Sequence, residues 1–381
     1  WEESSMVEWK ELGKIANRNK GIPITAGKMS ELSSKGGNVR VFAAGATIAD
    51  IDENNLPSNC AHRLPSIIVK SRGYIDFEFY EKPFTHKNEM WSYSFDNRQL
   101  GKFIYYFLTT QTDVFRKKAK ANSVKLPQLC VADTDNYLIP LPPLSEQTRI
   151  VSILDTFTSS ITNLKQQITE RRKQYEHYRD QLLDLEGKEG VEMKTLGETG
   201  TFIRGTGIQK NDFVESGYNC IHYGQIHTKY GLAASETISK IEEPLYKKSK
   251  KAQKGDIILA TTSEDAEGVA KPLVWLGEGE VAVSGDAFIF HHHQNGKFMA
   301  YQFASHRFML FKIRYATGAK VIRISGENMA KFKVALPPIE EQSRIVSLLD
   351  TFEASISNLE AQLKGREKQY EYYRNQLLTF E

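Results

Sequence analysis

Three consecutive histidines, His291, His292 and His293, are the residues of this sequence best suited by type to bind a metal ion. Neighbouring side chains of a strand point to opposite faces, so the three imidazoles cannot easily reach one ion together. The turn-forming segment Gln294-Asn295-Gly296 follows directly. We therefore predict that the histidines end a strand and do not form a metal centre.

The remaining residues contain no pattern that is typical of an active site. Glu264 and Asp265 form a carboxylate pair of the kind used in acid–base catalysis. No residues that could act with them as catalytic partners can be identified in the sequence. The segment 27–29, Gly-Lys-Met, lacks the spacing and the hydroxyl of a phosphate-binding loop. Glycine-rich loops for dinucleotides or adenosylmethionine are missing, as is the Asn/Asp-Pro-Pro-aromatic motif of amino-methyltransferases. We predict a chain without catalytic residues, cofactor or metal of its own.

Composition places this 381-residue chain among globular proteins, with 40% hydrophobic and 25% charged residues. No apolar run approaches the roughly 18 residues of a membrane span. Cys60, Cys130 and Cys220 have the spacing of neither a disulfide framework nor a zinc site, so we expect a protein of the reducing cytoplasm that contacts no membrane. Outside the two repeated segments described next, 39 basic residues face 32 acidic ones, an excess compatible with phosphate contacts.

The most informative pattern is an internal duplication. Residues 141–186 and 336–381 are identical at 29 of 46 positions, at a constant offset of 195. A weaker match relates 7–13 to 191–197 at an offset of 184. A repeat of this length is too long for a solenoid unit, so each copy should be a globular domain followed by a helix. The predicted divisions are domains at 1–140 and 191–335 and helical segments at 141–190 and 336–381.

Each repeated segment is predicted to be one long helix that begins after a double proline, Pro142-Pro143 or Pro337-Pro338. About 40 residues give a rod of roughly 60 Å, which is longer than the core of one domain can cover. We expect the two helices to pair as an antiparallel coiled coil with pseudo-twofold symmetry. Packing of each helix along its own domain is the alternative.

The proposed seam follows apolar residues whose steps alternate between four and three, which is typical of a heptad repeat. Arg171 and Arg366 interrupt it at equivalent positions, either to meet a carboxylate and fix the register or to reach solvent. The predicted seam residues are Leu154, Phe157, Ile161, Leu164, Ile168, Tyr175, Tyr178 and Leu182 in the first helix and Leu349, Phe352, Ile356, Leu359, Leu363, Tyr370, Tyr373 and Leu377 in the second.

The two globular domains are predicted to be mixed α/β (α+β) with many short strands. Residues 66–73 and 256–263 each combine a short apolar run with a polar loop, at corresponding places in the repeat. Lys125 and Lys320 lie at equivalent positions in loops that follow a predicted helix. Further strands are predicted at 89–95 and 282–290, and helices at 102–118 and 297–313.

The motif Leu-Pro-Pro-x-x-Glu-Gln-x-x-Ile-Val at 141–151 and 336–346, followed by a heptad helix that ends in Tyr-x-x-Tyr-Arg-x-Gln-Leu-Leu, resembles the specificity subunit of type I restriction–modification enzymes. The resemblance covers essentially the whole chain. Inside the globular domains it is looser. Segments 218–228 and 262–265 look like family loops in the second domain, whereas the first domain has different residues at the equivalent places, 41–45 and 71–74. We therefore expect the two domains to recognise different DNA sequences.

The resemblance implies a non-catalytic subunit in which each domain recognises one half of a bipartite double-stranded DNA target and the helices set the spacing. It also implies two modification subunits, which bind S-adenosylmethionine and methylate adenine, and restriction subunits, which are ATP- and Mg-dependent translocating nucleases. Two alternatives from the residues alone are a coiled-coil scaffold that binds only proteins and a self-contained enzyme acting on nucleic acid.

The candidate DNA contacts are mostly loop residues at corresponding places in the two copies. Lysines suit phosphates, whereas Arg72, His86, Gln225 and His227 are candidates for base edges. Tyr223 is the candidate most easily explained as a core residue. The full set is Lys70, Ser71, Arg72, Tyr74, His86 and Lys125 in the first domain and Tyr223, Gln225, His227, Thr261, Thr262, Ser263 and Lys320 in the second.

Overall fold

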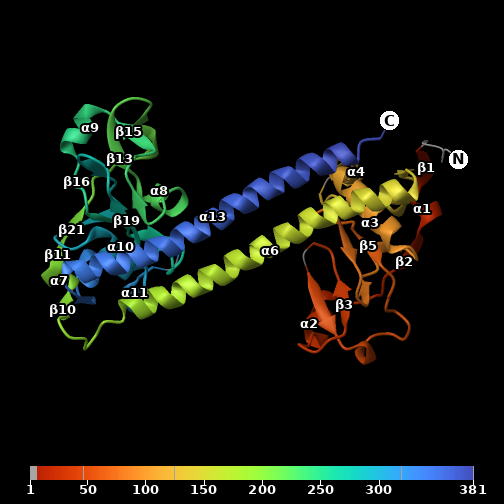
Figure 1. Cartoon of the computed structure of the whole chain (residues 1–381), viewed down its shortest axis with the longest axis horizontal. Coiled ribbons are helices and arrows are strands. Elements are labelled where there is room, and N and C mark those ends of the chain that lie inside the picture. The colour runs from red at the N-terminus through yellow and green to blue at the C-terminus, as the bar shows by residue number, and fades with distance from the viewer. Residues whose placement is uncertain (1–6, 46, 124, 319, 381) are drawn as a thin grey trace. The chain divides into compact units, whose positions relative to one another are not determined.

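The computed structural model of the protein describes residues 7–45, 47–123, 125–318 and 320–380 (Figure 1). It divides into two compact units, Trp1–Lys165 with Ala361–Glu381, and Gln166–Glu360. The long helices α6 (Leu144–Leu183) and α13 (Ile339–Leu377) each contribute residues to both units. Within the described ranges, no helix is both long enough and apolar enough to cross a membrane.

The first domain is built on an antiparallel sheet with the strand order β2-β8-β5-β6, accompanied by a smaller sheet β4-β3-β7 and the pair β1-β9. Phe103 and Phe115 are buried against Ile67 and Val69 of the central strand β5. The strands are β1 (Glu8–Glu11), β2 (Asn17–Lys20), β3 (Val39–Phe42), β4 (Ile48–Ile51), β5 (Ser66–Lys70), β6 (Asp76–Tyr80), β7 (Phe84–His86), β8 (Trp91–Ser94) and β9 (Leu138–Leu141). The helices are α1 (Leu12–Ile15), α2 (Ala26–Leu32), α3 (Arg98–Thr110), α4 (Thr112–Asn122) and α5 (Val131–Asp135), with a 3₁₀ turn at Glu53–Asn55.

The second domain repeats this plan with larger sheets, in the orders β11-β21-β17-β19-β14 and β12-β15-β13-β20-β16. The pairs β10-β23 and β18-β22 complete it. The strands are β10 (Glu192–Thr195), β11 (Gly200–Arg204), β12 (Phe213–Val214), β13 (Tyr218–Ile221), β14 (Ala233–Ala234), β15 (Ser239–Ile241), β16 (Lys251–Ala252), β17 (Ile257–Ala260), β18 (Thr262–Ser263), β19 (Lys271–Trp275), β20 (Val281–Val283), β21 (Ala287–His292), β22 (Ile322–Arg323) and β23 (Lys333–Leu336). The helices are α7 (Leu196–Thr199), α8 (Tyr223–Thr228), α9 (Glu243–Lys248), α10 (Gly296–Ala304), α11 (His306–Tyr315) and α12 (Gly326–Met329), with a 3₁₀ turn at Lys210–Asp212.

The predicted mixed α/β class is confirmed, but each of the helices predicted at 102–118 and 297–313 is interrupted. The first divides at Gln111 into α3 and α4, and the second divides at Ser305 into α10 and α11. Ser305 has an extended backbone, and its hydroxyl accepts a hydrogen bond from the Phe308 amide. A serine that caps a new helix in this way competes with continuation of the preceding one.

Within each unit, the segments of the two long helices run antiparallel and contact each other (Figure 1). Phe157 of α6 stacks on Tyr373 of α13 in the first unit, with ring centroids 5.3 Å apart, and Phe352 stacks on Tyr178 in the second, at 5.4 Å. Adding 195 to Phe157 and subtracting it from Tyr373 gives the second pair, so the contact is a true repeat. The predicted antiparallel contact is therefore present in both units.

Ion pairs across the same helices are also related by the repeat, but with their charges exchanged. Lys165 lies 3.0 Å from Glu367 in the first unit, and Arg172 lies 2.5 Å from Glu360 in the second. Arg366 places its guanidinium 5.6 Å from the centre of the Phe157 ring and is exposed. Of the two predictions for Arg366, the one in which it reaches solvent is therefore correct.

Several predicted seam residues pack on the globular cores as well as between the helices. Leu154 and Leu349 are fully buried members of the first and second domain cores. The ends of the helices do the same, because Leu377 of α13 packs on the first core and Leu182 of α6 packs on the second. Helix pairing and packing along a domain, predicted as alternatives, therefore occur together.

Each domain also holds the first half of its own long helix through one carboxylate. Asp155 of α6 accepts hydrogen bonds from Lys102 Nζ at 2.7 Å and from Tyr106 Oη at 2.6 Å. Asp350 of α13 makes the corresponding contacts in the second unit, with the lysine at 2.7 Å and the tyrosine at 2.8 Å. The repeat therefore preserves the helix attachment.

Candidate nucleic-acid interface

In the first domain, the loop after β5 pairs with the loop before α5. Arg72 and Gln128 form an antiparallel bridge. The flanking backbone hydrogen bonds run from Gly73 N to Pro127 O and from Leu129 N to Ser71 O, both 2.9 Å. The two loops singled out in the sequence, the one after β5 and the one with Lys125, are thus held together.

The second domain forms the same pairing. Thr262 of β18 lies opposite Arg323 of β22, and Ser263 lies opposite Ile322. Arg323 is equivalent to Gln128, at the repeat offset of 195. Thr262 is equivalent to Arg72 at an offset of 190, which is also the offset between the buried strands β5 and β17. Both domains therefore share a pairing of two loop strands, and in the second domain Arg323 also pairs with Thr317 on its other side.

Ser71 and Thr261 are buried, and their hydroxyls fix these loops to the domain core. The Ser71 hydroxyl donates to the Glu89 carbonyl at 2.7 Å, and the Thr261 hydroxyl donates to the Asp286 carbonyl at 3.2 Å. Ser71 is 0% and Thr261 6% exposed. The prediction of DNA contacts at these two residues is not supported, because their recurrence reflects a structural hydrogen bond.

His86 is a core residue of β7 and not a base-contacting side chain. It is fully buried, with Nε2 3.1 Å from the Ser92 hydroxyl and Nδ1 3.2 Å from the Lys87 carbonyl. Burial disfavours the charged imidazolium and lowers the pKa of His86 to about 4. A side chain without exposed surface cannot contact a base edge, so this candidate is corrected.

Four further candidates are engaged inside their own domains. The Gln225 amide donates to the Ser239 hydroxyl at 2.6 Å, and the Tyr223 ring packs on the core around β13. Lys70 forms an ion pair with Glu78 at 2.8 Å. His227 Nε2 lies 2.9 Å from the Thr262 carbonyl, which supports the ribbon from its side.

The candidate lysines remain exposed beside the ribbons, although the exposed carboxylates of Glu264 and Asp265 directly follow β18 in the second domain. Lys125 and Lys320 are exposed and form no ion pair with any described residue. Tyr74 is 60% exposed and is covered on one face by the Arg116 guanidinium, 5.1 Å from the ring centre. This surface suits a polyanion better than a small molecule.

Sequence reasoning missed Gln128 and Arg323, although both are exposed and both belong to the ribbons. Neither side chain has a hydrogen bond or ion pair with another described residue. The available signal was the constant offset of 195, which places them at the same position of the two copies three residues after Lys125 and Lys320.

The residues considered for metal or acid–base chemistry have other roles. β21 ends at His292, which confirms the predicted strand end, and His291 Nδ1 lies 2.7 Å from the Asp256 carboxylate. The Asp265 carboxylate accepts a hydrogen bond from the Gly268 amide and closes a turn. Among the described residues, no three potential ligands gather as a metal site would require.

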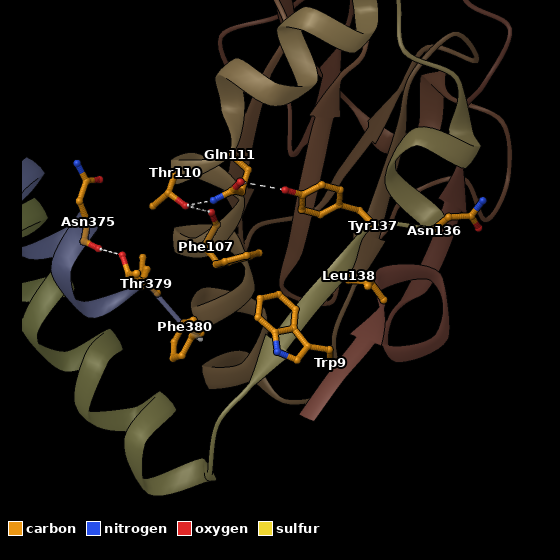
Figure 2. A pocket seen from close by; sticks show the side chains of 11 residues that line it. Trp9, Phe107, Thr110, Gln111, Asn136, Tyr137, Leu138, Asn375, Thr379 and Phe380 are labelled. Atoms are coloured by element: carbon orange, nitrogen blue, oxygen red, sulfur yellow. Dashed lines mark hydrogen bonds between the residues drawn. The ribbon is translucent and has the colours of Figure 1, made fainter. Parts of the chain in front are cut away.

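A hollow of about 720 Å³ lies in the first unit, where β1 and the end of α13 meet (Figure 2). Trp9 stands edge-on to Phe107, and Phe380 packs on the same ring. The Tyr137 hydroxyl donates to Gln111 at 2.9 Å. None of the described residues that line the hollow has a carboxylate, imidazole, thiol or cationic side chain.

Comparison with known proteins agrees with this architecture. The model of the type I restriction modification DNA specificity domain matches residues 2–171 and 188–366. The specificity subunit of an Escherichia coli type I restriction enzyme is 30% identical over 335 residues, which are 84% of this chain and 81% of that protein. A putative specificity subunit of Haemophilus influenzae is 28% identical, with 99% and 97% covered.

Solved structures show the same fold. The crystal structure of a type I restriction–modification S subunit from M. genitalium superposes with a TM-score of 0.62 at 15% identity, covering 99% of this chain and 97% of that one. The duplicated domains, the paired helices and these matches lead to one assignment. The chain belongs to the family of type I restriction–modification DNA specificity domains.

Proposed function

We propose that the protein is the DNA specificity subunit of a type I restriction–modification complex. Each globular domain recognises one half of a bipartite double-stranded DNA target, and α6 with α13 sets the number of unread base pairs between the halves. The observation that carries this proposal is the ribbon present in both domains, with exposed lysine and arginine side chains on a rigid support. Such a surface offers phosphate contacts from lysines and base contacts from forked donors.

Catalysis is assigned to partner subunits. Two modification subunits dock on the helices and domains, bind S-adenosylmethionine and methylate adenine at N6. Restriction subunits join them and use ATP and Mg²⁺ for translocation and cleavage. The duplication supports a pair of modification subunits, because two equivalent surfaces suit two copies of one partner.

The test is an exchange of residues 17–130 for the corresponding part of a related specificity subunit. The chain is expressed with its modification subunit, and the methylated motif is determined by sequencing. We expect one half of the motif to change, while the other half and the spacing stay as they were. A change in both halves would contradict separate recognition, and methylation without any sequence preference would contradict the specificity role itself.

A further inference from the structure

The two ribbons carry the same backbone bridge but different exposed side chains. In the first domain the bridge places Arg72 opposite Gln128, and in the second it places Thr262 opposite Arg323. Each ribbon therefore has one guanidinium, on the strand after β5 in the first domain and on the other strand in the second.

The geometry of an antiparallel bridge brings the opposed side chains to one face. The hydrogen bonds that flank Arg72 and Gln128 show that these two residues form the non-hydrogen-bonded type of pair, in which opposed side chains lie closest. In the second domain Thr262 is 9% exposed, so the exposed group on that face is Arg323. The face thus presents an arginine with a glutamine in one domain and an arginine alone in the other.

These side chains are exposed while their backbones are fixed, and the Glu89 carboxylate lies close enough to Arg72 to interact with its charge. Arg72, Gln128 and Arg323 form no side-chain hydrogen bond or ion pair with the rest of the described chain. Below them, the buried hydroxyls of Ser71 and Thr261 hold the loops. A ligand that binds here gains donors whose support is already ordered, which lowers the entropic cost of binding.

We propose that this bridge is the base-reading element of each domain, with Arg72 and Arg323 each contacting a guanine in the major groove. The inference rests on the proposed function and extends it to individual residues. A two-stranded ribbon fits the major groove, an arginine fork matches guanine O6 and N7, and a glutamine amide matches adenine N6 and N7. The first domain therefore requires a guanine beside an adenine, contacted by Arg72 and Gln128, and the second requires a guanine contacted by Arg323.

The neighbouring lysines provide the contrast between base and phosphate contacts. Lys125 precedes Gln128 by three residues, and Lys320 precedes Arg323 by three. A lysine is a point charge without a fork, which suits a phosphate, whereas the planar guanidinium supplies two parallel donors to one base. Lys320 and Arg323 thus form a matched pair of cations in one loop.

The experiment uses the complex with the modification subunit and compares Arg323→Ala, Arg323→Lys and Lys320→Ala. We expect Arg323→Ala to relax one position in the half-site of the second domain, with discrimination there falling by roughly 5- to 150-fold, the range of one bidentate contact. Arg323→Lys keeps the charge and should relax the same position without changing the salt dependence. Lys320→Ala should lower affinity for every duplex and leave the motif intact. Arg72→Ala should relax only the other half-site.

Two sets of results would overturn the inference. Full discrimination by Arg323→Lys, or a uniform loss of affinity with an intact motif in Arg323→Ala, would show a phosphate contact and overturn the inference. Unchanged affinity and motif in Arg323→Ala and Arg72→Ala would place the ribbons outside the interface and overturn it too. Failure of the proposed function is distinguishable, because the wild-type complex itself would then show no sequence preference.

Discussion

The attachment of each long helix to its own domain can be tested by removing one charge. Asp155→Asn preserves the shape of the side chain but loses the charge that Lys102 contacts at 2.7 Å, while the amide carbonyl can still accept from Tyr106. A hydrogen bond to a charged group contributes about 1.5–3 kcal/mol, and the Asp155 side chain is 29% exposed, which moderates the loss. We therefore expect the first unit to be destabilised by about 2 kcal/mol.

Hydrogen exchange measured by mass spectrometry resolves the effect, because a chain with two compact units need not unfold as one. About 2 kcal/mol corresponds to roughly 30-fold faster exchange of the protected amides in α3 and the first half of α6. Exchange in the second domain should not change, and Asp350→Asn should give the reverse pattern. Asp184→Asn, at an exposed aspartate near the end of α6, is the control. Acceleration in Asp155→Asn no greater than in that control would refute the reasoning.

Three further predictions concern acid stability, phosphate contacts and the spacing of the target. Burial lowers the pKa of His86 to about 4 from 6.5, so the unfolded state binds the proton first as the pH falls. The first domain should then lose about 2 kcal/mol between pH 7 and pH 5, a loss that His86→Gln should flatten in an acid-unfolding series. Lys125→Ala and Lys320→Ala should each lower the slope of log affinity against log salt by about 1 in anisotropy titrations, whereas Lys194→Ala should not; equal slopes in all three would exclude a phosphate role. Inserting one heptad after Lys165 and at the equivalent point of α13 should lengthen the unread gap by about three base pairs, since seven helical residues add roughly 10 Å, and an unchanged gap in the methylated motif would contradict the spacing role.

The long helices were predictable because a periodic pattern sustained over 40 residues leaves few alternatives. The interruptions at Gln111 and Ser305 were not, since apolar residues continue at helical spacing across both. What ends α10 is local competition, in which the Ser305 hydroxyl captures the amide of Phe308 and starts a new helix. The pattern of hydrophobic residues therefore does not predict where α10 ends.

The candidate site shows a different limit of sequence reasoning. Polar residues in a loop-like segment were predicted to face a ligand, yet His86 occupies β7 opposite Phe42, the position that Val283 takes opposite Ile221 in the second domain. All three residues of β7 are buried, so neither face of this strand is exposed and no alternation of polar and apolar residues marks the side on which His86 lies. Ser71 was misjudged for a related reason, because its partner is a backbone carbonyl 18 residues away.

The duplication separates what the fold requires from what recognition uses. The contact that holds the loops is the same in both domains, a buried hydroxyl donating to a carbonyl, as in Ser71 to Glu89. The exposed positions on the same loops differ, and the arginine lies on opposite strands of the two ribbons. A similar support with the guanidinium on the other strand presents its donors at a different place in the groove. The guanines contacted by Arg72 and Arg323 should therefore occupy non-equivalent positions in the two half-sites, which makes the complete target asymmetric even though the protein is a repeat.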